Sequence, residues 1–118
     1  GRKSFSETGS YIKGTMILEQ IKNQLINSLL QYHPEKIGIF GSYAREENKK
    51  DSDLDILISF RNRISLLQLV MIEQKLSDKL GVKVDLITEN GLKNPRLKQY
   101  ILKDLIIIFN EEERSDIS

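Results

Sequence analysis

Three aspartates and a Gly-Ser pair are the residues of this chain whose types and spacing could do chemistry. Asp53 and Asp55 stand two positions apart at the start of an apolar run, so on a strand both carboxylates would point to one face of a sheet. Gly41 and Ser42 directly follow an earlier apolar run, and Asp85 interrupts a later one. Carboxylates brought within a few ångströms of one another repel strongly in a partly buried site. The pattern therefore indicates a site that binds cations.

The carboxylate oxygens of these aspartates limit which cations could bind. Mg²⁺ is typically held by a few carboxylates, while waters and substrate phosphates fill its remaining positions. Gly41 and Ser42 could bind the phosphates. Glycine lets a ligand approach the backbone, and the helix expected to begin near Ser42 would present unpaired N–H groups at its N-terminus. Each feature alone is more often a turn, a cap or an edge residue. Their combination predicts a site for a magnesium-bound phosphate ligand.

The elements that must position these residues follow from the hydrophobic pattern. Apolar residues recur at three- and four-residue steps in the helical segments, and short apolar runs rich in β-branched residues indicate strands. The predicted helices are residues 17–32, 42–48 (with Ser42 near its N-cap), 64–80 and 94–103, and the predicted strands are residues 36–40, 53–60, 82–88 and 105–109. The helix over 64–80 should end at Gly81, and its apolar face should consist of Leu66, Leu67, Leu69, Val70, Ile72, Leu76 and Leu80.

The order of these elements predicts how the strands are arranged. The long helix between the second and third strands implies a right-handed crossover, so those strands should be parallel neighbours or near neighbours. The first strand should run antiparallel to the second, because the Gly-Ser pair and the Asp-x-Asp triplet then face one site. We expect an α/β (α+β) sandwich, in which helices flank a small mixed four-stranded sheet.

Composition limits the kind of protein. The chain has 118 residues, enough for one domain, and its 18 Lys and Arg nearly balance its 17 Asp and Glu. The absence of cysteine excludes disulfides and thiolate chemistry, and no apolar run approaches the roughly 20 residues that span a bilayer. We expect a domain over residues 16–110, preceded by a disordered extension or cloning remnant over 1–15 and followed by an acidic tail over 111–118.

These motifs resemble the nucleotidyltransferase superfamily related to DNA polymerase beta, whose pattern is Gly-Ser, a spacer, Asp-x-Asp and a third acid on a later strand. Here the pattern reads "GSYAREENKKDSDLDILIS" and "VKVDLI". The short length and the versions "GSYAR" and "SDLDILI" are similar to the minimal nucleotidyltransferases, or MNT proteins. The resemblance covers about residues 17–109 and implies a fold like the polymerase beta palm.

The resemblance also implies an activity. Family members transfer a nucleoside monophosphate from a triphosphate, usually ATP, to an acceptor hydroxyl and release pyrophosphate. By resemblance, Gly41 and Ser42 would hold the triphosphate, and Asp53 and Asp55 would bind both magnesium ions. Asp85 would complete the site of the metal that activates the acceptor, where it would also be placed to help remove the acceptor's proton.

Two neighbouring residues leave alternatives open. Arg45 either contacts phosphate, as part of the nucleotide site, or pairs with an acid that fixes the short helix. The family commonly has glycine where this chain has Glu46, and a glycine there could serve either a close backbone approach or a positive φ. Glu46 also places a carboxylate near the expected triphosphate.

The resemblance implies a partner as well, because the chain has no spare residues for a second, acceptor-binding lobe. MNT proteins typically act as antitoxins paired with a HEPN ribonuclease toxin, and some attach AMP to a tyrosine of that toxin. We therefore expect a cytoplasmic, magnesium-dependent protein adenylyltransferase in a hetero-oligomer with a HEPN protein, without membrane or direct nucleic-acid binding. A homodimer is a further option. The alternatives are transfer to a small molecule such as an aminoglycoside, with a second subunit completing the pocket, or a non-catalytic antitoxin that masks its toxin.

Overall fold

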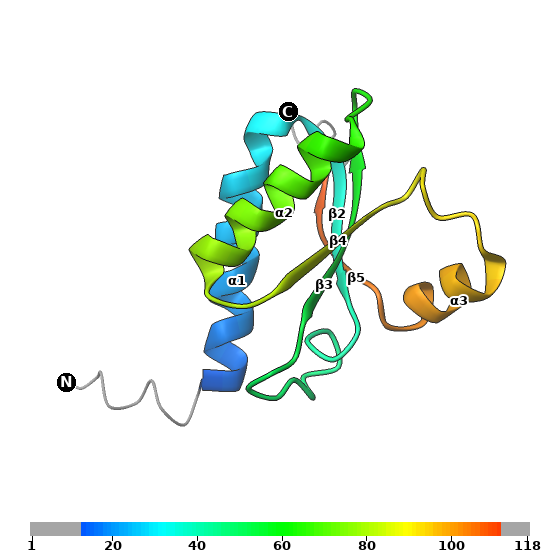
Figure 1. Ribbon diagram of the computed structural model, residues 1–118. Coiled ribbons are helices and arrows are strands. Elements are labelled where there is room, and N and C mark those ends of the chain that lie inside the picture. The colour runs from blue at the N-terminus through cyan, green and yellow to red at the C-terminus, as the bar shows by residue number, and fades with distance from the viewer. Residues whose placement is uncertain (1–12, 112–118) are drawn as a thin grey trace.

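The computed structural model describes residues 13–111 (Figure 1). Its elements in chain order are α1 (Lys13–Leu29), the 3₁₀ turn η2 (Leu30–Tyr32), β2 (Pro34–Phe40), β3 (Leu54–Phe60), α2 (Leu66–Leu80), β4 (Val84–Thr88), α3 (Pro95–Asp104) and β5 (Ile106–Asn110). Within the described residues, no helix has the length and apolar character needed to cross a membrane.

The four strands form one mixed sheet in the order β4-β3-β2-β5. β2 runs antiparallel to both β3 and β5, whereas β3 and β4 are parallel neighbours joined through α2. Both strand relationships predicted from the sequence are confirmed, and so is the mixed four-stranded α/β fold. The end of β2 and the starts of β3 and β4 therefore meet at one edge of the sheet, which we call the carboxylate edge.

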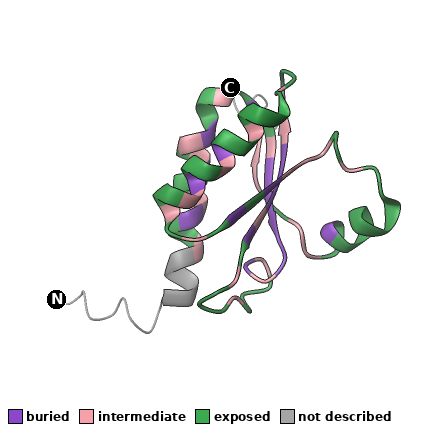
Figure 2. Cartoon of the chain, in the orientation of Figure 1, coloured by how far each residue is buried: buried purple, intermediate pink, exposed green. Residues whose placement is uncertain are grey.

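Helices cover the two faces of the sheet unequally. In Figure 1, α1 and α2 lie together on one side of the sheet and α3 lies on the other. The larger core lies under α1 and α2, and its strand residues include Ile37, Ile39, Leu54, Ile56 and Ile58. A smaller cluster of Phe40, Leu57 and Ile101 lies under α3, whose other residues are largely exposed (Figure 2).

The ends of α2 and α3 follow from local side-chain chemistry. The Ser65 hydroxyl accepts the Gln68 N–H at 3.1 Å, and Gly81 ends α2 with a φ of 75°. At the start of α3, Asn94 Oδ1 accepts the N–H of Arg96 at 2.9 Å, and Pro95 occupies the first turn. The sequence predicted the stop at Gly81 and the start at Asn94-Pro95 correctly, because caps are local signals, whereas the start of α2 lies two residues later than expected.

The largest differences from expectation concern α1, the Gly41–Glu46 segment and α2. α1 begins at Lys13, inside the stretch expected to precede the domain, because helical hydrogen bonds propagate beyond the apolar stripe. Residues 1–12 and 112–118, which include most of the two expected terminal segments, lie outside the described residues.

The short helix expected over 42–48 is only a turn, and in α2 Leu66, Leu67 and Val70 are exposed rather than part of the core.

Candidate active site at the carboxylate edge

Gly41 and Asp55 touch one another where β2 leaves the sheet. Phe40 pairs with Asp55 in the antiparallel ladder, and Gly41 then turns the chain with a φ of 77°. A Cβ atom on Gly41 would lie 2.4 Å from Asp55 Oδ2. Only glycine fits here, because the backbone conformation and the contact with the carboxylate both exclude a side chain.

The strand register brings Asp85 beside Asp55. The two residues are direct partners in the parallel ladder of β3 and β4, and neighbouring strands lie about 4.8 Å apart. Leu54 and Ile56 point into the core under α1 and α2, so Asp53 and Asp55 face the α3 side of the sheet. The same alternation puts Asp85 on that side.

Electrostatics show that the three carboxylates act on one another. The pKa of Asp55 is raised to about 6, first by burial and then by the charges of Asp85 and Asp53, while Arg45 opposes the shift. Asp53 and Asp85 themselves are exposed. The three carboxylates repel one another, and the partial burial of Asp55 strengthens that repulsion. A cation bound at this edge would offset it.

The donor set suits magnesium in its chemistry, because it consists of carboxylate oxygens on one open face. The side chains do not yet converge: among residues 13–111, no three or more His, Cys, Asp or Glu side chains are grouped closely enough to hold an ion. Asp53 and Asp85 are exposed and free to change rotamer, whereas Asp55 is fixed against Gly41. The backbone thus brings the three aspartates to one edge of the sheet, and their side chains would have to converge for a cation to be held there.

The turn after Gly41 is closed by backbone hydrogen bonds. The N–H of Glu47 donates to the Ser42 carbonyl at 2.8 Å, and the N–H of Glu46 donates to the Tyr43 carbonyl at 3.2 Å. Glu46 has a φ of 58°, so this is the Schellman pattern with a glutamate where glycine is usual. Of the two reasons considered for a glycine at this position, the structure selects the positive φ.

A single turn is too short to act through a helix dipole, which removes part of the reasoning behind the predicted phosphate site. What remains is the Ser42 side chain, because Gly41 is buried against the Asp55 carboxylate. Ser42 is half-buried, and its hydroxyl makes no hydrogen bond within the described part of the chain. The Ser42 hydroxyl is therefore available to a ligand at the carboxylate edge.

Tyr43 anchors this turn, a role that the sequence analysis missed. Its side chain is buried in the core under α1 and α2. Burial raises the pKa of the Tyr43 hydroxyl, and the charge of Asp53 raises it further. An aromatic residue just after the Gly-Ser pair was the available signal.

Arg45 is held by acids from two directions. Its Nη1 donates to Asp104 Oδ2 at 2.7 Å and its Nε donates to Glu47 Oε1 at 2.9 Å. The hydrogen bonds to Glu47 and Asp104, with a further one to Tyr100, raise the pKa of Arg45. The structure thus favours the acid-pairing alternative for Arg45, and Asp104, at the end of α3, has no local sequence signal for this contact.

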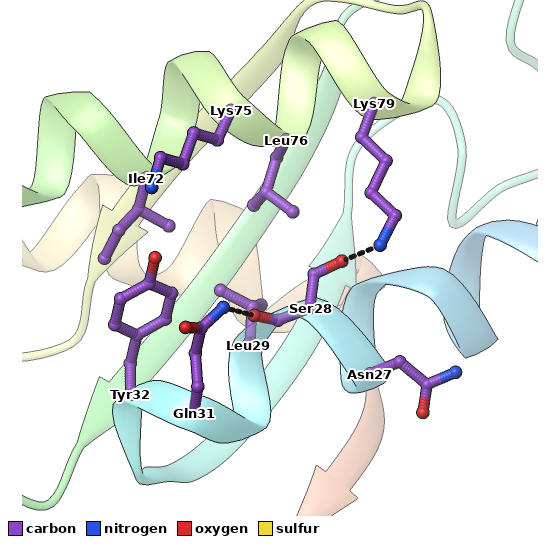
Figure 3. Close-up of a pocket in the computed structure, with 9 residues that line it drawn as sticks. All are labelled: Asn27, Ser28, Leu29, Gln31, Tyr32, Ile72, Lys75, Leu76 and Lys79. Carbon is purple, nitrogen blue, oxygen red and sulfur yellow. Dashed lines mark hydrogen bonds between the residues drawn. The ribbon is translucent and has the colours of Figure 1, made fainter.

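Two hollows of the molecule lie away from the aspartates. A cavity of about 240 Å³ lies between α1 and α2, on the opposite face of the sheet (Figure 3). A second, of about 440 Å³, is lined by residues from the far ends of β3 and β4, including Arg63 and Lys93. None of the three aspartates lines either hollow, and Asp53 and Asp85 are exposed at the carboxylate edge.

Comparisons with known proteins agree with this geometry. Residues 22–113 match the nucleotidyltransferase domain family. A Methanocaldococcus jannaschii protein, provisionally named a protein adenylyltransferase, is 56% identical over 78 residues, which cover 66% of this chain and 80% of the relative. The protein adenylyltransferase MntA of Thermococcus cleftensis is 41% identical over 73 residues, 62% of this chain and 73% of that relative.

Solved structures share the fold. A provisionally named minimal nucleotidyltransferase is 34% identical with a TM-score of 0.64, covering 75% of this chain and 93% of its own. A toxin-antitoxin complex with AMP-PNP gives a TM-score of 0.70 at 21% identity, over 81% and 78% of the two chains. A complex of a tri-AMPylated HEPN toxin with its MNT antitoxin, from Shewanella oneidensis, gives 0.66 at 20% identity, over 85% and 78%. From its motifs, its fold and these matches, the chain belongs to the nucleotidyltransferase family and is a minimal nucleotidyltransferase.

Proposed function

We propose that this chain transfers AMP from ATP to a tyrosine hydroxyl of a HEPN partner protein, with Mg²⁺ bound at the carboxylate edge. The observation that carries the proposal is the meeting of Gly41, Asp53, Asp55 and Asp85 at one open edge of the sheet. An open edge suits a protein acceptor, because a macromolecule brings its own surface to complete the site. A small-molecule acceptor would need a wall that the described residues do not form.

The comparisons support the choice of nucleotide and partner. One structural neighbour is a toxin-antitoxin complex with AMP-PNP, an ATP analogue. Another is an MNT antitoxin in complex with a HEPN toxin that carries three AMP groups. The curated relatives named as protein adenylyltransferases fit the same reaction.

Each residue of the edge has a defined task in this reaction. Gly41 has no side chain and so accommodates the Asp55 carboxylate beside it, and Ser42 offers its hydroxyl to the triphosphate. The acceptor oxygen attacks the α-phosphorus, pyrophosphate leaves, and Asp85 on the exposed side accepts the acceptor's proton. Magnesium, when bound by the aspartates, neutralises phosphate charge and aligns the attacking and leaving oxygens. Arg45 fixes the turn that carries Gly41 and Ser42.

The test is transfer of label from α-labelled ATP to a co-expressed HEPN protein in the presence of Mg²⁺. We expect Asp53→Asn and Asp55→Asn to reduce labelling at least about a hundredfold, as expected for loss of a metal ligand. Asp51→Asn is the matched control, because Asp51 is an exposed loop carboxylate two residues from Asp53. Labelling that persists in both variants would contradict the proposal, and toxin neutralisation without labelling would identify a masking antitoxin.

A further inference from the structure

Four large apolar side chains stand exposed on the first two turns of α2. Leu66 is 76% exposed, Leu67 72%, Val70 50% and Met71 51%, and we call these residues the α2 patch. Their spacing puts them on one side of the helix, while Ile72 and Leu76 face the core. This fold leaves these four side chains exposed to water. Another protein surface that covered them would gain free energy from the hydrophobic effect.

The rim of the α2 patch is positively charged. Arg63 lies just before the helix and Lys75 lies one turn beyond Met71, and neither makes an ion pair with the described residues. The acids of α2 are placed differently: Glu73 is half-buried and accepts the N–H of Leu86 at 2.7 Å, and Asp78 lies near the C-terminal end of the helix, where it accepts a hydrogen bond from Gln74 at 3.2 Å. A surface that complements this rim would carry carboxylates around an apolar centre.

The patch lies between two hollows. On one side, the cavity of about 240 Å³ between α1 and α2 includes Ile72 and Lys75, and Lys79 reaches across it to the Ser28 hydroxyl (Figure 3). On the other side, the hollow of about 440 Å³ is lined in part by Arg63 and Ile64. A protein surface with protruding side chains can fill such hollows, whereas a planar lipid surface cannot.

A second copy of this chain fits the patch less well than a different protein. In an antiparallel two-fold contact centred on the patch, Arg63 of one copy would lie near Lys75 of the other, so two cations would meet. Like charges brought together at the rim of an apolar contact oppose association. The charge pattern therefore favours a partner of different sequence.

We propose that the α2 patch is the docking site for a partner protein that presents an apolar ridge flanked by Asp or Glu side chains. This inference rests on the proposed function only in taking the HEPN acceptor to be that partner. The loop leading into α2 follows the end of β3 opposite Asp53, and the seven-residue strand between them is about 20 Å long. A partner held there leaves the carboxylate edge open for the residue that receives AMP.

The test measures binding of the purified HEPN protein to the full chain by titration calorimetry. We expect Leu67→Glu to weaken binding at least about tenfold and Leu67→Glu with Met71→Glu to weaken it further. A glutamate in the first turn favours the helix, so circular dichroism should show an intact fold. The matched control is Leu102→Glu, which charges a leucine of α3 that is 52% exposed, and it should bind like the wild type.

The rim has a test of its own. Arg63→Glu should weaken binding and reduce its dependence on salt, while Arg63→Lys should retain most of the affinity. Wild-type affinity in the double patch variant would overturn the proposal, as would failure of the HEPN protein to bind the wild-type chain. A homodimer that the patch variants dissociate, or patch-dependent binding to anionic phosphatidylserine vesicles, would also overturn it.

The two proposals can fail separately. If the HEPN protein binds through the patch but receives no label from ATP, the proposed reaction fails and the docking site stands. If labelling requires Asp53 but proceeds with unchanged rate and affinity in the patch variants, the docking site fails and the reaction stands. Asp53→Asn should bind the HEPN protein as tightly as the wild type in either case.

Discussion

At the scale of single residues, two backbone positions with positive φ determine the geometry of the candidate site. Gly41 begins the turn and Glu46 ends it, with φ values of 77° and 58°. The first is a glycine that the contact with Asp55 requires. The second is a glutamate, so this chain carries strain where a glycine would carry none.

Glu46→Gly should stabilise the protein by about 1 kcal/mol, because a non-glycine residue pays about that amount in the left-handed region. The melting temperature should rise by several degrees, measured by circular dichroism. Glu46→Ala is the control, since alanine removes the carboxylate but keeps the strain. Equal stabilisation by alanine would mean that the charge, not φ, is the unfavourable feature.

Gly41→Ala should abolish labelling of the acceptor, because the new methyl group displaces the Asp55 carboxylate. Gly81→Ala is a close control: Gly81 has a φ of 75°, but its Cβ would meet no atom within 4 Å. Both variants should lose about 1–2 kcal/mol of stability from the positive φ. Only Gly41→Ala should lose transfer, and loss in both variants would point to general destabilisation.

The raised pKa of Asp55 predicts how stability changes with pH in the metal-free protein. The pKa of about 6 lies above the unfolded value of about 3.9, so between these values the native state binds more protons. The contribution of Asp55 therefore favours folding most below about pH 4 and is lost as the pH rises through about 6. Solvent screening limits the loss to about 1 kcal/mol.

Asp55→Asn should remove that loss and stabilise the protein at pH 7 by about the same amount, measured by urea unfolding with EDTA present. The difference between variant and wild type should shrink towards about pH 4. Asp51→Asn, on the exposed loop, should leave the pH profile unchanged. A difference between Asp55→Asn and the wild type that stays constant from pH 4 to pH 7 would show that the carboxylate is not destabilised in the native state.

At the scale of elements, α3 is the most weakly attached helix. Ile101 is its only fully buried residue, and Asp104, 16% exposed at its side chain, ties its last turn to Arg45. The sequence predicted α3 and its cap, since Asn94-Pro95 is a local signal. It could not predict the Arg45–Asp104 contact, because the two residues are far apart in sequence and many acids could pair with one arginine.

Asp104→Asn should loosen α3 without unfolding the sheet. The free energy of unfolding should fall by about 1 kcal/mol, because the Arg45 side chain is 36% exposed and water screens the ion pair. Hydrogen exchange should accelerate in α3 and in the Gly41–Glu46 turn but not in α1 or α2. Lys103→Gln, one residue earlier in the same helix, is the control, and identical exchange in both variants would show that the ion pair does not hold the helix.

At the scale of the whole molecule, the sequence predicted the sheet and the carboxylate edge better than it predicted the surface. Strand pairing followed from crossover geometry and from the need to bring Gly41 to Asp53 and Asp55, so two kinds of reasoning agreed. The face of α2 was assigned wrongly in part, because apolar residues on two sides of a helix give one broad stripe in sequence. Periodicity identifies residues that avoid water, but not whether this chain or another one covers them.

We expect the same edge geometry to make the proposed binding of metal and nucleotide cooperative. Mg²⁺ alone must bring exposed Asp53 and Asp85 together against Asp55, and a triphosphate alone would meet three negative side chains. Bound together, each offsets the charge that opposes the other, so AMP-PNP with Mg²⁺ should raise the melting temperature more than the sum of the separate effects. Asp51→Asn should keep this synergy and Asp53→Asn should lose it. Simple addition of the two shifts in a thermal scan would mean that metal and nucleotide bind at separate places on the molecule.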